Sequence, residues 1–406
     1  MFKAYDVRGK YGEEVTEENF IKLGKALNSF SNKLVLGSDF REKNDSLTKA
    51  LFSGFEGEKI SVGVAPTAAV CFISKDLGVS LTASHNPAGY NGAKFFLNRR
   101  PFFEEEMTRA KNNYSTQSTS ASSSDSKFNN ELLANYVNEL PLAENGVFDL
   151  GGGAACVFAG LFPETIYSKP DPTYEKHSPE PTKDALIDLI KITKEKNCLG
   201  FAFDGDADRV AVVDSGEFID SNILTAFLAS KFAGKNDSIV VTLDISQEVV
   251  DFLRNQGLKV FPWMIGDVFV LKKAMQENAV FAAEKGGHYT FPNFLQHSDG
   301  IYVSCLLSRT KPGELIEFSK QFSSTSLYEN LPGRVVQEKL LTAVTELNPL
   351  ELISVDGVKA VFEDYSFFIR PSNTEPKTRL MAESKNSEKA KQAMSTALEI
   401  AKSCLG

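Results

Sequence analysis

The segment GFAFDGDADRVAVV, residues 200–213, decides how the middle of this chain folds. Its apolar ends, 200–203 and 210–213, have the length and composition of short buried strands. Between them, Asp204, Asp206 and Asp208 alternate with small residues, and Arg209 follows directly. Carboxylate oxygens suit a hard cation such as Mg²⁺, and a cation beside an arginine stabilises a phosphoryl group during its transfer. An acidic solvated turn explains the hexapeptide alone equally well, so the rest of the chain has to decide.

Similar short runs on both sides of this segment predict alternating strands and helices. The predicted strands before it lie at residues 33–37, 60–64, 79–82 and 147–150, and each ends at a turn signal. After it, a strand at 239–243 runs into a helix at 247–255. Such alternation is typical of parallel α/β layers. The last quarter differs, because short strands at 358–362, 366–369 and 378–383 are followed by a terminal helix at about 387–404.

The Ser- and Thr-rich stretch 115–126 predicts a flexible surface loop or linker, with a phosphorylated tract as the alternative. We place a domain boundary just after it. The predicted domains are residues 1–129, 130–222, 223–326 and 327–406. The predicted fold class is therefore three consecutive α/β domains with mixed sheets around a central cleft, plus a smaller C-terminal α+β domain.

Composition limits the classes of partner. The net charge of −9 argues against a nucleic-acid partner, although a local cationic cluster can still bind phosphate. No apolar run approaches the roughly 20 residues needed to cross a bilayer, and the N-terminus lacks the apolar core of a signal peptide. Five cysteines are scattered without a CxxC pair, which favours a reducing compartment. We therefore expect a cytoplasmic protein with neither a nucleic-acid nor a membrane partner.

Three further segments carry chemistry. LTASHNP at 81–87 follows a strand, and its turn would present Ser84 at the strand's carboxyl end, where ligands collect in open α/β sheets. EKGGH at 284–288 offers a carboxylate and a histidine that titrates near neutral pH. RPSNTEP at 370–376 joins a guanidinium, hydroxyls and an amide in one loop, a set that suits phosphate. Each segment also fits an ordinary turn or hairpin loop.

Three alternative motifs fit poorly. GGGAAC at 151–156 has Cys156 where a dinucleotide fingerprint needs Gly or Ala. An EF-hand starting at Asp204 would need Gly where Arg209 stands and Glu where Ser215 stands. A phosphatase-type aspartyl nucleophile commonly stands in an Asp-x-Asp-x-Thr/Val motif. This motif also fits poorly, because the fifth position of the loop is Asp208 instead of Thr or Val.

With YDVRG at 5–9, these four segments resemble, in this order, those of the α-D-phosphohexomutases. The resemblance runs from Tyr5 to Pro376. It implies that Ser84 carries the transferred phosphoryl group. Mg²⁺ would be held by Asp204, Asp206, Asp208 and an oxygen of the phosphorylated Ser84. The resemblance assigns acid–base and supporting roles to Lys94, His288, His85 and Arg8. It assigns substrate contacts to Arg209, Glu284, Gly286, Arg370, Ser372, Asn373 and Thr374.

The implied activity interconverts hexose 1-phosphates and hexose 6-phosphates through a hexose 1,6-bisphosphate, which also serves as activator. The spacing at residues 86–92 favours mannose or glucose, and phosphoglucosamine mutase is the alternative. A sugar-phosphate phosphatase and a non-catalytic phosphosugar sensor are rival hypotheses. The sugar loop departs from the family pattern because it lacks a serine after Glu284, and Asn373 replaces a usual glycine. The expected partner is a small phosphosugar, and the expected assembly is a monomer or a weak homodimer.

Overall fold

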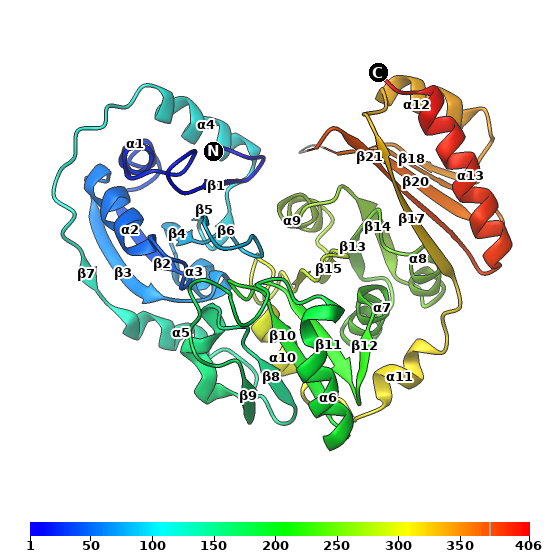
Figure 1. Ribbon diagram of the computed structural model, residues 1–406, viewed down its shortest axis with the longest axis horizontal. Coiled ribbons are helices and arrows are strands. Elements are labelled where there is room, and N and C mark those ends of the chain that lie inside the picture. The colour runs from blue at the N-terminus through cyan, green and yellow to red at the C-terminus, as the bar shows by residue number, and fades with distance from the viewer. Residues whose placement is uncertain (373–374) are drawn as a thin grey trace. The chain divides into compact units, whose positions relative to one another are not determined.

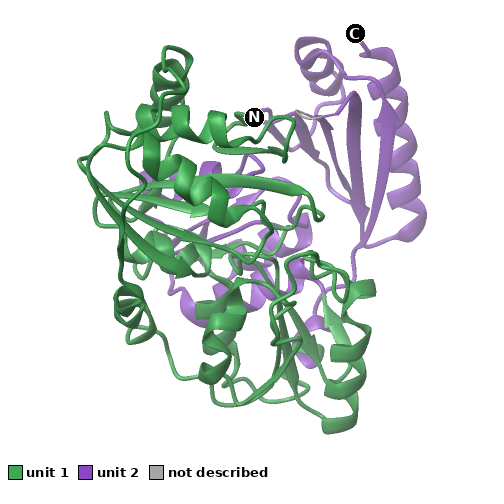
Figure 2. Ribbon diagram, turned by 60° about the vertical axis from the view of Figure 1, so that its left-hand side comes forward, with its two compact units in different colours: residues 1–219, 286–316 green, residues 220–285, 317–406 purple. Residues whose placement is uncertain are grey.

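The structure is a computed structural model that describes residues 1–372 and 375–406. Its chain divides into two compact units, which Figure 2 colours separately. The first unit comprises Met1–Ile219 and Gly286–Ile316, and the second comprises Asp220–Lys285 and Glu317–Gly406. None of the helices within the described ranges is long and apolar enough to cross a membrane.

The first unit begins with a mixed sheet in the order β1-β5-β4-β2-β3-β7, with β6 paired to β5 (Figure 1). Its strands are β1 (Asp6–Lys10), β2 (Lys33–Ser38), β3 (Glu58–Val64), β4 (Leu77–Leu81), β5 (Tyr90–Leu97), β6 (Arg100–Pro101) and β7 (Lys127–Phe128). Strands β2, β3, β4 and β7 run parallel, whereas β5 is antiparallel to β1 and β4. The parallel strands therefore end at one edge of the sheet, where Ser38 and Leu81 lead into loops.

Helices cover both faces of this sheet. They are α1 (Glu17–Leu27), α2 (Asn44–Gly54), α3 (Thr67–Ile73) and α4 (Glu104–Ser115). Phe20, Leu47 and Met107, from α1, α2 and α4, share one apolar core with the sheet. Helix α3 packs on the opposite face, where a Cβ added at Gly37 of β2 would lie 2.5 Å from Val70 Cγ2. The missing side chain at Gly37 therefore lets α3 approach the sheet closely, which positions the first turn of α3.

The second sheet of the first unit has the order β12-β11-β10-β8-β9. Its strands are β8 (Val147–Asp149), β9 (Glu164–Ile166), β10 (Leu199–Phe203), β11 (Val210–Asp214) and β12 (Glu217–Ile219). The other elements are the 3₁₀ helices η1 (Asn130–Leu132), η2 (Ala154–Leu161) and η3 (Lys183–Leu186), the helices α5 (Leu133–Val137), α6 (Ile187–Lys196) and α10 (Gly300–Leu307), and β16 (Tyr289–Thr290). Strands β10 and β11 pair antiparallel from Phe203 opposite Val210, so the aspartate loop joins two adjacent strands.

The second unit contains a parallel arrangement of β14 (Lys259–Trp263), β13 (Ser238–Thr242) and β15 (Phe281–Ala283), with helices α7 (Ser221–Phe232), α8 (Gln247–Asn255) and α9 (Asp267–Gln276). Helix α11 (Glu314–Ser319) contains the point where the chain returns to this unit. The C-terminal sheet is antiparallel and has the order β17-β21-β20-β19-β18. Its strands are β17 (Thr325–Pro332), β18 (Glu351–Ile353), β19 (Val358–Val361), β20 (Ser366–Pro371) and β21 (Lys377–Ser384). Helices α12 (Gln337–Thr345) and α13 (Ser387–Ser403) cover this sheet (Figure 1) and share its apolar core.

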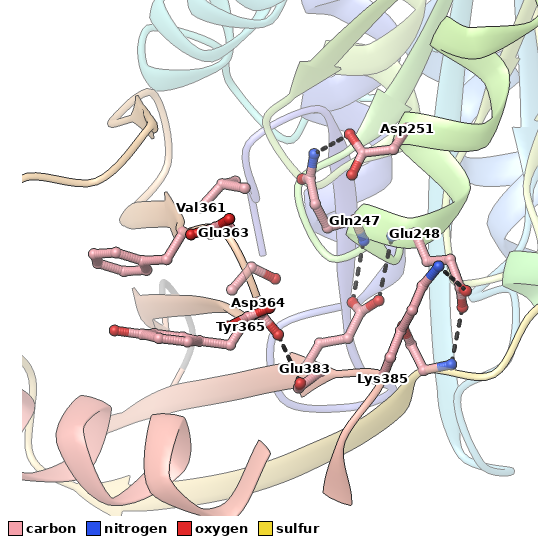
Figure 3. Close-up of a pocket in the computed structure, with 13 residues that line it drawn as sticks. Gln247, Glu248, Asp251, Val361, Glu363, Asp364, Tyr365, Glu383 and Lys385 are labelled. Atoms are coloured by element: carbon pink, nitrogen blue, oxygen red, sulfur yellow. Dashed lines mark hydrogen bonds and ion pairs between the residues drawn. The ribbon is translucent and has the colours of Figure 1, made fainter. Parts of the chain in front are cut away.

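A buried carboxylate joins the two parts of the second unit (Figure 3). Glu383 on β21 accepts hydrogen bonds from the backbone N–H groups of Gln247 (3.1 Å) and Glu248 (3.3 Å), at the start of α8. The N-terminus of a helix favours a negative charge. On β19, Lys359 donates to the carbonyl oxygen of Ile245 at 2.9 Å. Because Glu383 and Lys359 are 3% and 2% exposed, the parallel and antiparallel sheets of this unit are held together by buried charged groups.

The predicted fold class is confirmed, with mixed α/β sheets followed by a smaller α+β sheet. The four domain boundaries stay a prediction. The small-residue segment after β8 forms the 3₁₀ helix η2, and the C-terminal sheet contains two unpredicted strands, β17 and β18. The Ser- and Thr-rich loop has no regular structure over residues 117–126, yet it contacts the first sheet's helices, because the Ser122 N–H donates to the Ser53 carbonyl at 2.8 Å.

Candidate functional site

The aspartate loop between β10 and β11 gathers three buried carboxylates. Asp204, Asp206 and Asp208 are each 1% exposed or less, and one oxygen from each lies within 4.8 Å of the others. The triple glycine after β8 makes room for this loop, because a Cβ at Gly153 would lie 2.7 Å from the carbonyl oxygen of Gly205. The glycine segment therefore packs directly against the aspartate loop.

The donor set of this cluster fits a divalent cation that prefers oxygen. Within the described structure, Asp206 Oδ1 and Asp208 Oδ1 are buried and accept no hydrogen bond. Burial, together with the charges of Asp206 and Asp208, raises the pKa of Asp204 well above its usual value. Buried carboxylates that repel one another and leave oxygens unpartnered are a set that a hard cation stabilises. Asp204, Asp206 and Asp208 therefore have the chemistry of Mg²⁺ ligands.

Lys94 on β5 supplies positive charge to the same cluster. Its Nζ lies 2.7 Å from Asp206 Oδ2 and 2.5 Å from Asp208 Oδ2. Burial raises the pKa of Asp206 and of Asp208, but the charge and hydrogen bond of Lys94, joined by the Thr67 hydrogen bond on Asp206 and by the charges of His297 and Arg209 on Asp208, together hold both pKa values below the usual range. The structure thus places an ammonium group, which can donate protons, directly against two of the candidate metal ligands.

Ser84 lies against the third carboxylate. The loop after β4 places Ser84 Oγ 2.9 Å from Asp204 Oδ2, to which it donates, and the side chain is 2% exposed. The Ser84 backbone adopts a φ of 51°, an uncommon left-handed conformation for a non-glycine residue. The Ser84 N–H donates to Thr82 Oγ1 at 2.8 Å, which fixes the turn. The structure thus brings together a candidate nucleophile and a candidate metal loop that lie 120 residues apart in sequence.

Two cationic or titratable side chains border Ser84. His85 Nδ1 lies 3.3 Å from Ser84 Oγ. Burial, reinforced by the charges of Arg209, Arg8 and Lys94, lowers the pKa of His85 to about 3, so this imidazole is neutral at neutral pH. Arg8 on β1 donates to Asn86 Oδ1 at 2.7 Å and to Asp6 Oδ2 at 2.7 Å, and so supports the Ser84 loop at Asn86.

His288 is held in one tautomer by two partners. Arg209 Nε donates to His288 Nε2 at 2.8 Å, so the proton of the neutral ring is on Nδ1. Nδ1 lies 2.9 Å from Ser298 Oγ and donates to it. Burial, together with the charges of Arg209 and Lys94, lowers the pKa of His288 well below its usual value. The Nε2 lone pair of this neutral histidine is taken by Arg209 in this structure, so His288 can act as a general base only when that hydrogen bond is released.

Arg41, which no sequence motif predicted as a site residue, holds the Ser84 loop. Arg41 donates to the carbonyl oxygens of Ser84 (2.7 Å), Asn86 (2.5 Å), Pro87 (2.9 Å) and Tyr90 (3.1 Å). Its guanidinium also pairs with Asp39, at 3.2 Å. The sequence does carry a signal for Arg41, because an Asp-x-Arg pair follows β2 at the edge where parallel strands end.

Thr67 and Ser298 were also missed. Thr67, at the first turn of α3, donates from Oγ1 to Asp206 Oδ2 at 2.7 Å, and its N–H donates to the Asp206 carbonyl at 3.0 Å. Thr67 lies 139 positions from Asp206 in sequence, and Ser298, which accepts from His288 Nδ1, lies in an irregular loop. No local motif marks either residue.

The remaining predicted site residues divide between the two units. Gly286 belongs to the first unit and is exposed. Glu284, Arg370 and Ser372 belong to the second unit. Arg370 Nε pairs with Asp356 Oδ2 at 2.8 Å.

The loop after Arg370 is closed by local hydrogen bonds. Ser372 N–H donates to the Lys377 carbonyl at 2.8 Å, and Ser372 Oγ accepts from the Glu375 N–H at 3.2 Å. Asn373 and Thr374 lie outside the described residues. In the sugar loop, Lys285 contacts Tyr328, with Nζ 4.2 Å from the ring centroid and in contact with the hydroxyl.

Comparison with known proteins identifies the family. Four models of phosphoglucomutase/phosphomannomutase match: alpha/beta/alpha domain I at residues 1–120, domain II at 154–217, domain III at 220–314 and the C-terminal domain at 333–400. The chain belongs to the phosphoglucomutase/phosphomannomutase family, the α-D-phosphohexomutases. It is therefore a phosphohexomutase, an isomerase that transfers a phosphoryl group within a sugar phosphate.

Individual relatives cover the whole chain. A probable phosphoglucosamine mutase of Methanobrevibacter smithii is 31% identical over 99% of this chain and 98% of its own length. A probable phosphoglucosamine mutase of Pyrococcus abyssi is 30% identical over 100% and 98%. A solved structure of a phosphoglucomutase/phosphomannomutase family protein from Burkholderia thailandensis shares the fold with a TM-score of 0.85 at 22% identity, over 100% of this chain and 98% of that one.

Proposed function

We propose that this phosphohexomutase is a phosphoglucosamine mutase that uses Ser84 as its phosphoryl carrier. The observation that carries the catalytic part is the 2.9 Å hydrogen bond from Ser84 Oγ to Asp204, inside a carboxylate cluster with unpartnered buried oxygens. The choice of sugar is supported by the names of the two relatives at about 30% identity. Those names favour the alternative reading over the mannose or glucose preference inferred from residues 86–92.

The cluster is proposed to hold Mg²⁺ through Asp204, Asp206 and Asp208, together with an oxygen of phosphorylated Ser84. When bound, Mg²⁺ supplies positive charge to the oxygens of the transferring phosphoryl group. A phosphoserine adds about −1.5 to −2 charges at pH 7, and the sugar phosphate adds a second dianion. The chain's own cations near Ser84, which include Lys94 and Arg209, are therefore needed to bring the two anions together.

The proposed cycle has two mirrored transfers. The phosphorus–oxygen bond to Ser84 breaks as a phosphorus–oxygen bond forms to a free hydroxyl at C1 or C6 of the sugar. The hydroxyl proton would pass to His288 Nε2 once Arg209 releases it, and Lys94, which lies against Asp206 and Asp208, would return a proton to Ser84 Oγ. The resulting hexose 1,6-bisphosphate reverses its orientation, and its other phosphoryl group returns to Ser84. Both steps depend on in-line positioning and charge stabilisation.

The sugar loop and the loop after Arg370 are proposed to bind the rest of the substrate. Glu284 and Gly286 flank Lys285 in the sugar loop and would contact sugar hydroxyls. Arg370, Ser372, Asn373 and Thr374 would hold the phosphate that does not react. An arginine carries five N–H donors, so the contact of Arg370 Nε with Asp356 fixes the side chain and leaves donors for a phosphate.

Side-by-side turnover of glucosamine, mannose and glucose 1-phosphates tests the proposal. With Mg²⁺ and catalytic hexose 1,6-bisphosphate, we expect the largest kcat/KM for glucosamine 1-phosphate and only a small release of inorganic phosphate. A larger kcat/KM for mannose or glucose 1-phosphate would overturn the sugar assignment alone. Phosphate release that matches substrate loss would overturn the mutase cycle in favour of a phosphatase.

The role of Ser84 has its own test. Ser84→Ala should abolish both turnover and the phosphorylated enzyme detected by mass spectrometry. Ser29→Ala is the matched control, because Ser29 Oγ donates only to the nearby Ala26 carbonyl and accepts from Asn113, far from the aspartate loop in sequence. Turnover that survives Ser84→Ala would remove the phosphoserine from the mechanism.

A further inference from the structure

A cavity of about 790 Å³ lies in the first unit, at the edge of the first sheet opposite the Ser84 loop. Its lining includes Lys33, Glu58 and Leu77, which are the first residues of the parallel strands β2, β3 and β4. Ser84, by contrast, follows the last residue of β4. Five strand residues span roughly 16 Å, so this amino-end cavity is separate from the catalytic site.

Arg99 is the most unusual side chain in the amino-end cavity. Its guanidinium carbon lies 4.5 Å from the centroid of the Phe72 ring. Its Nε is buried and has no hydrogen-bond partner among the described residues. The Phe72 ring also stacks on Phe294, at 5.9 Å between centroids. A guanidinium that lies over an aromatic ring, with a donor that no described residue uses, is a group that can bind an anion.

The other lining residues balance one another in charge and add amides, so Arg99 supplies the one net positive charge of the lining. Lys33, Lys75 and Lys127 are the other cationic lining residues. Lys33 pairs with Glu58 at 3.3 Å. The remaining acidic lining residues are Asp76 and Glu139, and the amides are Asn129, Asn135, Asn138 and Asn293. The cavity thus combines a cationic group for an anion with neutral donors and acceptors for an uncharged polar part.

We propose that the amino-end cavity binds an organic phosphate, with the phosphate at Arg99 and the organic part against the asparagine amides and Phe294. The size of the cavity supports this class of ligand, because ligand pockets of small molecules span about 300–1,000 Å³. Inorganic phosphate would leave most of that volume unfilled. Nucleotides and sugar phosphates share the required chemistry, an anionic phosphate on a polar, partly apolar body.

Calorimetric titration of the full-length protein tests the site with four probes: ADP, UDP, glucosamine 6-phosphate and inorganic phosphate. We expect at least one organic probe to bind the wild type, and its affinity to fall tenfold or more in Arg99→Ala, because a hydrogen bond to a charged group contributes about 1.5–3 kcal/mol. Arg100→Ala is the matched control. Arg100 also lies over an aromatic ring, 4.3 Å from Phe103, but it is paired with Glu106 at 2.7 Å and does not line the cavity.

The four probes separate the sources of the ligand. Loss of ADP or UDP binding in Arg99→Ala would assign a nucleotide. Glucosamine 6-phosphate is also expected to bind the catalytic site. The supporting result for this probe is therefore two binding sites in the wild type and one binding site in Arg99→Ala. Thermal unfolding and mutase turnover close to wild-type values would show that Arg99→Ala is folded.

Three results would overturn the proposal. They are the absence of binding by every organic probe at millimolar concentration, unchanged binding in folded Arg99→Ala, and equal weakening in Arg99→Ala and Arg100→Ala. Inorganic phosphate that binds as tightly as every organic probe would also overturn it, because the organic part would then contribute nothing. If Arg99→Ala unfolds, Arg99→Lys takes its place. This variant keeps the positive charge but should still bind the organic phosphate more weakly than the wild type. The titration does not depend on turnover, so its failure is distinct from a failure of the proposed mutase function.

Discussion

Replacing Arg41 by methionine tests whether one buried guanidinium holds the Ser84 loop. Methionine keeps most of the apolar stem and removes the donors that bind four backbone carbonyls and Asp39. Arg41 is 4% exposed and Asp39 is 1% exposed, so the substitution leaves a buried carboxylate without its cation. Breaking a buried pair from one side costs about 3–5 kcal/mol. We therefore expect the free energy of unfolding to fall by about that amount.

Arg254→Met provides the matched control. Arg254 forms a bidentate pair with Glu351, at 2.9 and 3.1 Å, but both side chains are 35% exposed. Exposed ion pairs contribute about 0–1 kcal/mol because water screens them. The two variants remove the same chemical group from a paired arginine, so the difference between them measures the effect of burial and of the loop carbonyls.

Urea unfolding followed by far-ultraviolet circular dichroism, and steady-state turnover, are the two assays. Beyond its lower stability, Arg41→Met should lower kcat about 10²-fold, because a displacement of about 1 Å at a reacting group can cost that much. Arg254→Met should leave kcat near the wild-type value. Stability of Arg41→Met within about 1 kcal/mol of Arg254→Met, with unchanged kcat, would refute the role assigned to Arg41.

Three further substitutions probe the site and its surroundings. Asp206→Asn should lower kcat at least ~10²-fold through loss of transition-state charge stabilisation, and unchanged turnover at saturating Mg²⁺ would count against the metal assignment. Ser298→Ala removes the partner of His288 Nδ1 and should lower kcat about tenfold, the equivalent of one hydrogen bond of about 1.5 kcal/mol; a kcat within twofold of wild type would exclude this positioning role. For His177, burial lowers the pKa, but the hydrogen bond and charge of Asp149 outweigh it, so the pKa is raised above 6.5. The wild type should therefore be more stable than His177→Gln below pH 6.5, and this advantage should shrink as pH rises through the raised pKa; a stability difference that grows with pH would contradict the pairing.

Local sequence patterns predicted the buried strands because those strands are short apolar runs with turn signals at their ends. Helix α8 spans Gln247–Asn255, as expected, and β10 begins one residue before the predicted run. Strand β17 escaped prediction because its sequence TSLYENLP mixes polar and apolar residues, and most of it is exposed or half-buried. Its pairing with β21 over eight residues is a long-range property that no local pattern reveals.

The same distinction separates the site residues that were predicted from those that were missed. Ser84 and the three aspartates stand in compact motifs, so the sequence names them, although it does not show that β4 and β10 bring them into contact. Arg41 acts on Ser84 across 43 positions, and Thr67 acts on Asp206 across 139. The role of such a side chain depends on contacts between distant segments, so it can be recognised in the folded structure but not in the sequence.

The charges around Ser84 explain why the site needs a cation as well as its own basic residues. Lys94 already neutralises part of a cluster of three buried carboxylates, and it contacts two of them directly. His85 and His288 add no positive charge at neutral pH, since burial and neighbouring cations lower both pKa values. A phosphoryl group on Ser84 would add about −1.5 to −2 charges beside Asp204, so that with the three carboxylates the negative charge would exceed the two positive charges of Lys94 and Arg209. In the proposed cycle the phosphorylated enzyme is therefore the state that a divalent cation would stabilise most, and we expect the affinity for Mg²⁺ to rise when Ser84 is phosphorylated.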